Sequence, residues 1–94
     1  MGYRFEWAPR KAAANLQKHK VSFREATTVF RDPLSATISD PDHSDWEASF
    51  VDLGLSHRGR LLVVWYIERG DNIRIISARR ASRSEQRRYE GEPK

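Results

Sequence analysis

The segment from Ile73 to Glu90 changes its pattern halfway, and this change predicts how the chain ends. Its first residues alternate as in an extended chain, with Ile73, Ile75 and Ser77 on one face and Arg74, Ile76 and Ala78 on the other. This period and the β-branched residues predict a strand that is buried on both faces. The sequence from Ser82 to Glu85 then has the form of a capping box, which starts a helix. We therefore expect a strand followed at once by a short helix.

Arginines are concentrated at this junction of strand and helix. Six of them lie in the segment: Arg74, Arg79, Arg80, Arg83, Arg87 and Arg88. Only Glu85 and Glu90 oppose them, so the segment carries a net charge of +4, equal to the formal charge of the whole chain. A guanidinium binds phosphate through two parallel hydrogen bonds, whereas an ammonium is a point charge. The cluster favours a phosphate-bearing partner. The alternative is a solvated helix face on which Glu85 pairs with a neighbouring arginine.

Length and composition limit the class of protein. The 94 residues predict one domain, residues 1–94, with a frayed tail from about residue 90. The absence of cysteine excludes disulfides and thiolate metal sites. The longest apolar run, residues 61–67, is far shorter than the roughly 20 residues that span a bilayer. With no signal-peptide pattern at the N-terminus, we expect a cytoplasmic protein that is not bound to a membrane.

The first third of the chain predicts a strand and two helices. Tyr3 to Trp7 alternates aromatic and polar residues, as a short strand does. Pro9 suits the first position of a helix that runs to Lys20. Its expected inner stripe is Ala12, Ala13, Leu16 and His19, with Arg10, Lys11, Lys18 and Lys20 outside. A second capping box, Ser22 to Glu25, predicts a second helix that ends at Asp32-Pro33.

Four further strands are expected after these helices. They are predicted near residues 34–39, 48–56, 61–68 and 73–80, with turn residues between them. Short connections make consecutive strands pair antiparallel, as a meander. The expected fold class is therefore α+β: a strand, two helices, a four-stranded antiparallel meander and a short C-terminal helix.

Two further groups of residues have side chains that could carry chemistry. The loop from Asp40 to Glu47 contains four acids and His43, but its spacing fits no calcium or zinc motif. We expect no metal or cofactor there, and instead an acidic hairpin tip or a contact for a basic partner. His19 can act as a general acid or base, and Lys18 beside it can bind phosphate. The alternative for His19 is a helix-end histidine that interacts with the helix dipole.

Several of these segments together resemble the BrnT family of ribonuclease toxins of type II toxin-antitoxin systems, which have a RelE-like fold. The similar segments are residues 5–33, 43–47, 54–69 and 74–90, and the last of them, RIISARRASRSEQRRYE, is the most specific. The resemblance implies an endoribonuclease that cuts mRNA without metal and inhibits translation. It also implies a ribbon-helix-helix antitoxin of the BrnA type, which neutralises the toxin in a hetero-oligomer that binds operator DNA. An alternative from another class is a non-catalytic module that binds RNA or a partner.

The resemblance also suggests roles for individual residues. Arg79, Arg80 and Arg83 are the expected phosphate clamp. Glu85 is the candidate base if its carboxylate is free of the cap, and His19 or Tyr89 is the candidate acid. The candidate RNA contacts are Lys18, Arg60, Arg80, Arg87 and Tyr89.

This chain departs from the family pattern at three places. It has Ala8 where the family has Asp, Lys20 where it has Gly, and Ala48-Ser49 in place of an acidic residue and arginine. The first change should remove a helix cap. The second should place a side chain at a left-handed helix end. The third removes an arginine that could contact RNA.

Overall fold

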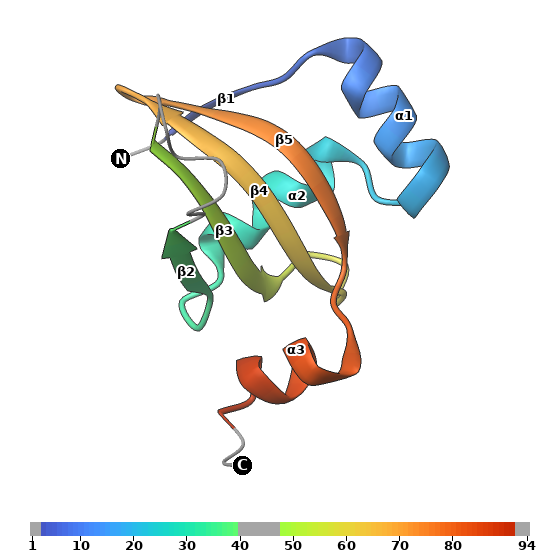
Figure 1. Ribbon diagram of the computed structural model, residues 1–94, viewed down its shortest axis with the longest axis vertical. Coiled ribbons are helices and arrows are strands. Elements are labelled where there is room, and N and C mark those ends of the chain that lie inside the picture. Colours follow the sequence, from blue (N-terminus) through green and yellow to red (C-terminus); the bar gives the residue numbers. More distant parts are fainter. Residues whose placement is uncertain (1–2, 40–47, 92–94) are drawn as a thin grey trace.

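The computed structural model describes residues 3–39 and 48–91. In this part of the chain five strands form one sheet in the order β1-β5-β4-β3-β2 (Figure 1). The strands are β1 (Arg4–Glu6), β2 (Ala36–Ser39), β3 (Ala48–Leu55), β4 (Leu61–Arg69) and β5 (Asn72–Arg80). The helices are α1 (Pro9–His19), α2 (Phe23–Thr27), the 3-10 helix η1 (Thr28–Arg31) and α3 (Arg83–Tyr89). The α+β class is confirmed.

The sheet is mixed rather than purely antiparallel. Strands β2 to β5 pair antiparallel in sequence, which confirms the meander. Strand β1 adds a fifth, parallel strand at the edge, where Phe5 lies opposite Ile73. Glu6 supports this pairing, because its carboxylate accepts hydrogen bonds from Arg74 at 3.0 Å and Asn72 at 3.2 Å. The predicted four-stranded sheet therefore lacked β1. Alternation in the sequence identifies a strand, but it does not identify the strand with which it pairs.

The core lies between one face of the sheet and the segment from Val21 to Phe30. Figure 1 shows α2 behind the strands, with α1 along the β5 edge and α3 beyond the end of β5. The main buried side chains are Val21, Phe23, Ala26, Val29, Leu62, Val64, Tyr66, Ile73, Ile75 and Ala78. Alternation along β4 places Leu62, Val64 and Tyr66 in this core. Val63, Trp65 and Ile67 therefore lie on the opposite face, which we call the open face.

The predicted inner stripe of α1 was partly wrong. Leu16 is 49% exposed and Ala13 is also exposed, whereas Asn15 is only 7% exposed. The second helix is also shorter than predicted, because α2 ends at Thr27 and the chain continues as a 3-10 turn. Its capping box is half formed. Ser22 accepts from the Glu25 amide, but the Glu25 carboxylate binds Ser56 and Arg60 instead.

A β-bulge in β5 changes which residues face the core. Trp65 pairs with Ser77, but the next residue of β4, Tyr66, pairs with Ile75, so Ile76 is an extra residue. Ile73 and Ile75 are buried as predicted, yet Ala78 rather than Ser77 continues the core face. Arg79 therefore shares the open face with Trp65. Around these two residues the face is only partly buried, whereas the sequence predicted burial on both faces.

The two predicted changes at the ends of α1 are confirmed. Ala8 precedes the helix without a side-chain cap hydrogen bond, and Pro9 occupies the first helical position. Lys20 has a φ of 60° and ends the helix in the left-handed conformation. No helix within residues 3–39 and 48–91 is long and apolar enough to cross a membrane.

Candidate functional site

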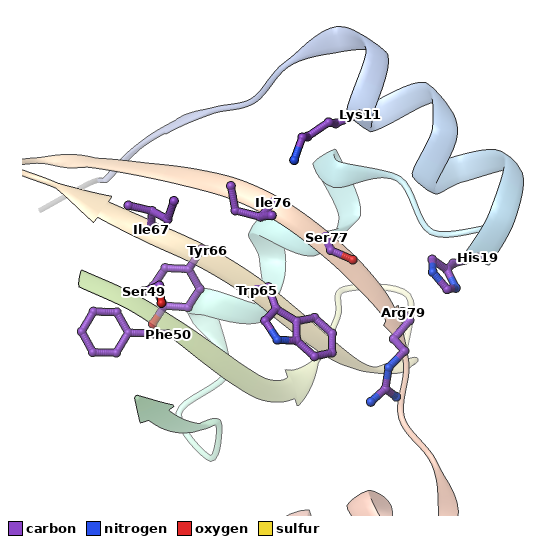
Figure 2. Close-up of a pocket in the computed structure, with 10 residues that line it drawn as sticks. All are labelled: Lys11, His19, Ser49, Phe50, Trp65, Tyr66, Ile67, Ile76, Ser77 and Arg79. Atoms are coloured by element: carbon purple, nitrogen blue, oxygen red, sulfur yellow. The ribbon is translucent and has the colours of Figure 1, made fainter. Parts of the chain in front are cut away.

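A groove of about 750 Å³ lies over the open face of the sheet, between β4, β5 and α1 (Figure 2). It is lined by Lys11, His19, Ser49, Phe50, Trp65, Tyr66, Ile67, Ile76, Ser77 and Arg79. The strands provide a mostly apolar floor. Lys11 and His19 from α1 and Arg79 from β5 place basic side chains around it (Figure 2). None of the described lining residues is acidic, so the groove suits an anionic ligand with apolar parts.

Arg79 is held in place by an acid and an aromatic ring. Its Nη1 and Nη2 atoms each donate to one oxygen of Glu85 at 2.9 Å, and Nη1 also donates to the Arg80 carbonyl at 3.0 Å. Its Cζ atom lies 5.3 Å from the centre of the Trp65 ring, within cation–π range. The hydrogen bonds from Glu85 raise the pKa of Arg79 above its usual range. A permanently charged guanidinium is thus fixed over the floor of the groove.

Glu85 is fully engaged and is a poor base in this structure. The predicted capping box is confirmed: Ser82 Oγ accepts from the Glu85 amide, and Glu85 accepts from the Ser82 amide at 2.7 Å. The hydrogen bonds from Arg79, with smaller effects from Ser82, lower the pKa of Glu85 to about 2. A carboxylate of such low pKa binds a proton weakly at neutral pH. The structure favours the alternative of an acid paired with a neighbouring arginine, so Glu85 orients Arg79.

The position of His19 beside the groove depends on a polar contact of Asn15 that the sequence did not reveal. Asn15 lies one helical turn before it and points toward β5. Its Nδ2 atom donates to the carbonyls of Val21 at 2.9 Å and Ala78 at 2.8 Å, while its Oδ1 atom accepts from the Ala78 amide at 3.2 Å.

This contact occurs where β5 has no strand beside it. Strand β1 pairs only with residues 72–74, so the Ala78 backbone would otherwise lack a partner on that side. The Asn15 amide takes the place of a strand and fixes α1 against β5. Arg79 is the residue after Ala78, and His19 is on the same helix as Asn15. The contact of Asn15 with Ala78 therefore sets the spacing between His19 and Arg79.

Lys11 and Trp65 also line the groove, although the sequence did not point to either as a site residue. Lys11 was placed on the outer face of α1, yet its side chain extends over the β5 edge (Figure 2). Trp65 was treated only as part of a central strand. Its position between Val63 and Ile67, out of phase with the core residues of β4, was the signal that it faces away from the core.

Arg60 and Tyr89 have structural roles that conflict with their predicted ones. Arg60 donates from Nε to Glu25 at 3.0 Å and from Nη2 to the Lys20 carbonyl at 3.0 Å, and its side chain is only 18% exposed. Arg60 therefore has a structural role, and it does not line the groove. The Tyr89 hydroxyl donates to Asp32 at 2.6 Å, and this bond raises the pKa of Tyr89 to about 12. Such a hydroxyl is a poor acid near neutral pH.

The remaining predicted cations lie outside the groove lining. Lys18, Arg80, Arg83 and Arg87 are exposed, and their side chains form no ion pair with any described residue. Of the predicted site residues, the structure thus brings His19 and Arg79 to the groove, with Glu85 paired to Arg79.

The acidic loop from Asp40 to Glu47 and the last three residues of the expected tail lie outside the described residues. In the described ranges there is no group of three or more acidic or histidine side chains that could hold a metal ion.

A family model and a solved structure are similar to this chain. Residues 7–85 match the family model described as the ribonuclease toxin BrnT of type II toxin-antitoxin systems. The crystal structure of the Brucella abortus ribonuclease toxin BrnT is similar in fold, with a TM-score of 0.69 at 18% sequence identity. The similarity covers 87% of this chain and 100% of that one. A search of curated protein sequences found no significant match.

Proposed function

Because this chain belongs to the BrnT family of ribonuclease toxins of type II toxin-antitoxin systems, we propose that it cleaves mRNA without metal and thereby inhibits translation. The observation that carries the proposal is the groove in which His19 and Arg79 lie together over an apolar floor. A proton-transfer group beside a fixed cation is the minimum that phosphodiester cleavage by an internal nucleophile requires.

The proposed reaction uses the 2′-hydroxyl of the RNA as the nucleophile. His19 accepts the 2′ proton as the 2′-oxygen bonds to phosphorus and the bond from phosphorus to the 5′-oxygen breaks. The 5′-oxygen takes a proton from water, which leaves a 2′,3′-cyclic phosphate and a 5′-hydroxyl. Arg79 stabilises the negative charge that develops on the phosphate oxygens, and Glu85 keeps its guanidinium in position. We assign the base to His19 because Glu85 is engaged and Tyr89 is bonded to Asp32.

The first experiment compares His19→Gln with Gln17→Ala. Gln17 lies on the same helix, but it is exposed and does not line the groove. In EDTA, the purified protein should cut single-stranded RNA to cyclic-phosphate ends. Loss of the base should slow cleavage by about 100-fold or more, whereas the control should change it only slightly. Intact RNA with the unmodified, antitoxin-free protein would favour the non-catalytic RNA-binding module instead.

A second experiment separates the two arginines of the proposed clamp. Arg79→Ala and Arg83→Ala should each weaken cleavage by about 1.5–3 kcal/mol, the usual contribution of a charge-assisted hydrogen bond. Only the first should also lower thermal stability, because Arg79 pairs with Glu85 whereas Arg83 has no ion pair with a described residue. Arg79→Lys should restore activity in part. If each alanine variant loses stability to the same extent as activity, the two arginines are structural rather than catalytic.

The proposal includes the antitoxin. Helix α3 buries none of its residues and carries Arg83, Arg87 and Arg88, so an acidic segment of a partner can cover it without displacing a core. We propose a ribbon-helix-helix antitoxin of the BrnA type that forms a hetero-oligomer with the toxin and binds operator DNA.

Such an antitoxin should compete with RNA, and Arg83→Glu should weaken the binding of both. Titration of antitoxin into a complex with labelled RNA tests this. Retention of RNA at saturating antitoxin would show that inhibition acts through another surface.

A further inference from the structure

Trp65 is a large aromatic side chain on the open face of the central part of the sheet. Its ring lies in the groove between Ile67 and the Arg79 guanidinium (Figure 2). Val63, two residues earlier on the same face, is only 3% exposed, but Trp65 remains partly exposed. The Arg79 guanidinium lies over the ring, and the remaining surface of Trp65 lines the groove, where a ligand with a flat apolar face can contact it.

The charges around Trp65 indicate what kind of ligand this is. Lys11, His19 and Arg79 lie around the groove, and none of the described side chains that line it is acidic. An aromatic floor within a basic rim is the arrangement by which proteins bind single-stranded nucleic acid, with bases stacked on rings and phosphates held by cations.

The contact between Arg79 and Trp65 joins these two functions. The guanidinium that we assign to the phosphate lies 5.3 Å from the centre of the ring. In a nucleotide the phosphate and the base are connected through one sugar, so a phosphate at Arg79 brings a neighbouring base close to the indole. In a duplex this base is paired and stacked within the helix, where a ring on the protein cannot reach it.

We propose that this groove is a nucleobase subsite in which one unpaired base, next to the phosphate bound by Arg79, stacks on Trp65. The subsite makes the protein selective for single-stranded RNA. The identification of RNA as the ligand rests on the proposed ribonuclease function, but base stacking itself requires no cleavage.

The experiment measures binding to an RNA that cannot be cut. A short 2′-O-methyl oligonucleotide lacks the nucleophile, so its affinity reports on binding alone. Trp65→Leu should weaken single-strand binding about 10-fold or more, since stacking of one base on an aromatic ring has about this effect. Trp65→Phe should retain part of the affinity. Tyr3→Leu is the matched control, because Tyr3 is a 58% exposed aromatic residue that does not line the groove.

A second measurement identifies the base. Single abasic residues are placed in turn along the oligonucleotide, and one position should lose affinity for the unmodified protein but not for Trp65→Leu, because both changes remove the same stacking contact. Thermal melts establish that the variants are folded. The unmodified protein should also bind the single strand more tightly than the matching duplex.

Three results would overturn the subsite: unchanged affinity in folded Trp65→Leu, equal affinity for the duplex, or additive losses at every abasic position. Loss of antitoxin binding with unchanged RNA binding would instead assign the groove to a protein partner. If the unmodified protein binds the oligonucleotide through Trp65 but never cleaves natural RNA, the ribonuclease proposal fails while the subsite stands.

Discussion

Replacement of Asn15 by alanine should destabilise the fold by about 3 kcal/mol. The Asn15 amide satisfies the carbonyls of Val21 and Ala78 and the amide of Ala78, and the residue is 7% exposed. Alanine leaves these three backbone groups without their partner, and a buried polar group without a partner costs about 1–3 kcal/mol. We use the lower bound because water can enter the space that the shorter side chain leaves. The loss is a large fraction of the roughly 5–15 kcal/mol that stabilises a small domain.

Urea unfolding followed by far-ultraviolet circular dichroism measures this loss. Gln17→Ala is the control, since Gln17 is exposed on the same helix and its replacement should change the free energy of unfolding by less than about 0.5 kcal/mol. Asn15→Ala should also lower ribonuclease activity per folded molecule, because α1 no longer holds His19 against β5. A loss below about 1 kcal/mol would refute the view that this amide replaces a strand.

Asn15→Asp gives the same contact a pH dependence. The aspartate keeps an acceptor for the Ala78 amide, but its second oxygen faces two carbonyl oxygens where Nδ2 donated. Burial and these oxygens should raise the pKa of the new carboxyl in the folded state. The folded state then binds the proton more tightly than the unfolded state, so stability should fall as the pH rises above about 4. A flat profile relative to the unmodified protein would contradict this account.

Three further predictions concern other parts of the fold. Ala8→Asp and Lys20→Gly should each stabilise the protein by about 1 kcal/mol in urea titrations. The first adds the missing helix cap, and the second removes a side chain from a residue at positive φ. No gain in either variant would contradict the view that these two residues act locally on the ends of α1. Asp52 is 3% exposed, and burial raises its pKa, so stability should decline as the pH rises through the folded-state pKa; Asp52→Asn should remove this dependence. Glu85 has the opposite sign: its pKa falls from 4.5 to about 2, so its contribution is present above 4.5 and lost toward pH 2, and Glu85→Gln should flatten the acid limb of the unfolding profile.

The sequence determined the order of the elements because the signals for them are local. The capping box from Ser82 to Glu85 closes within four residues, and the alternation before it spans a few more. Pro9, Ala8 and Lys20 likewise act on the helix that they flank, so their effects could be predicted without tertiary structure. The family membership of the chain was also visible in its segments, and the family model confirms it.

The tertiary structure decided which predicted residues form the candidate site. Glu85 and Arg79 lie close in sequence, but whether the carboxylate was free depended on where the β5 bulge directed the guanidinium. Arg60 lies outside the groove and is engaged by Glu25, far earlier in the chain. Asn15 gained its role from the Ala78 backbone 63 residues away, at an edge that β1 is too short to cover. Such contacts depend on strand register and on where each strand ends. Neither can be predicted from the local sequence around a residue that lies far away in the chain.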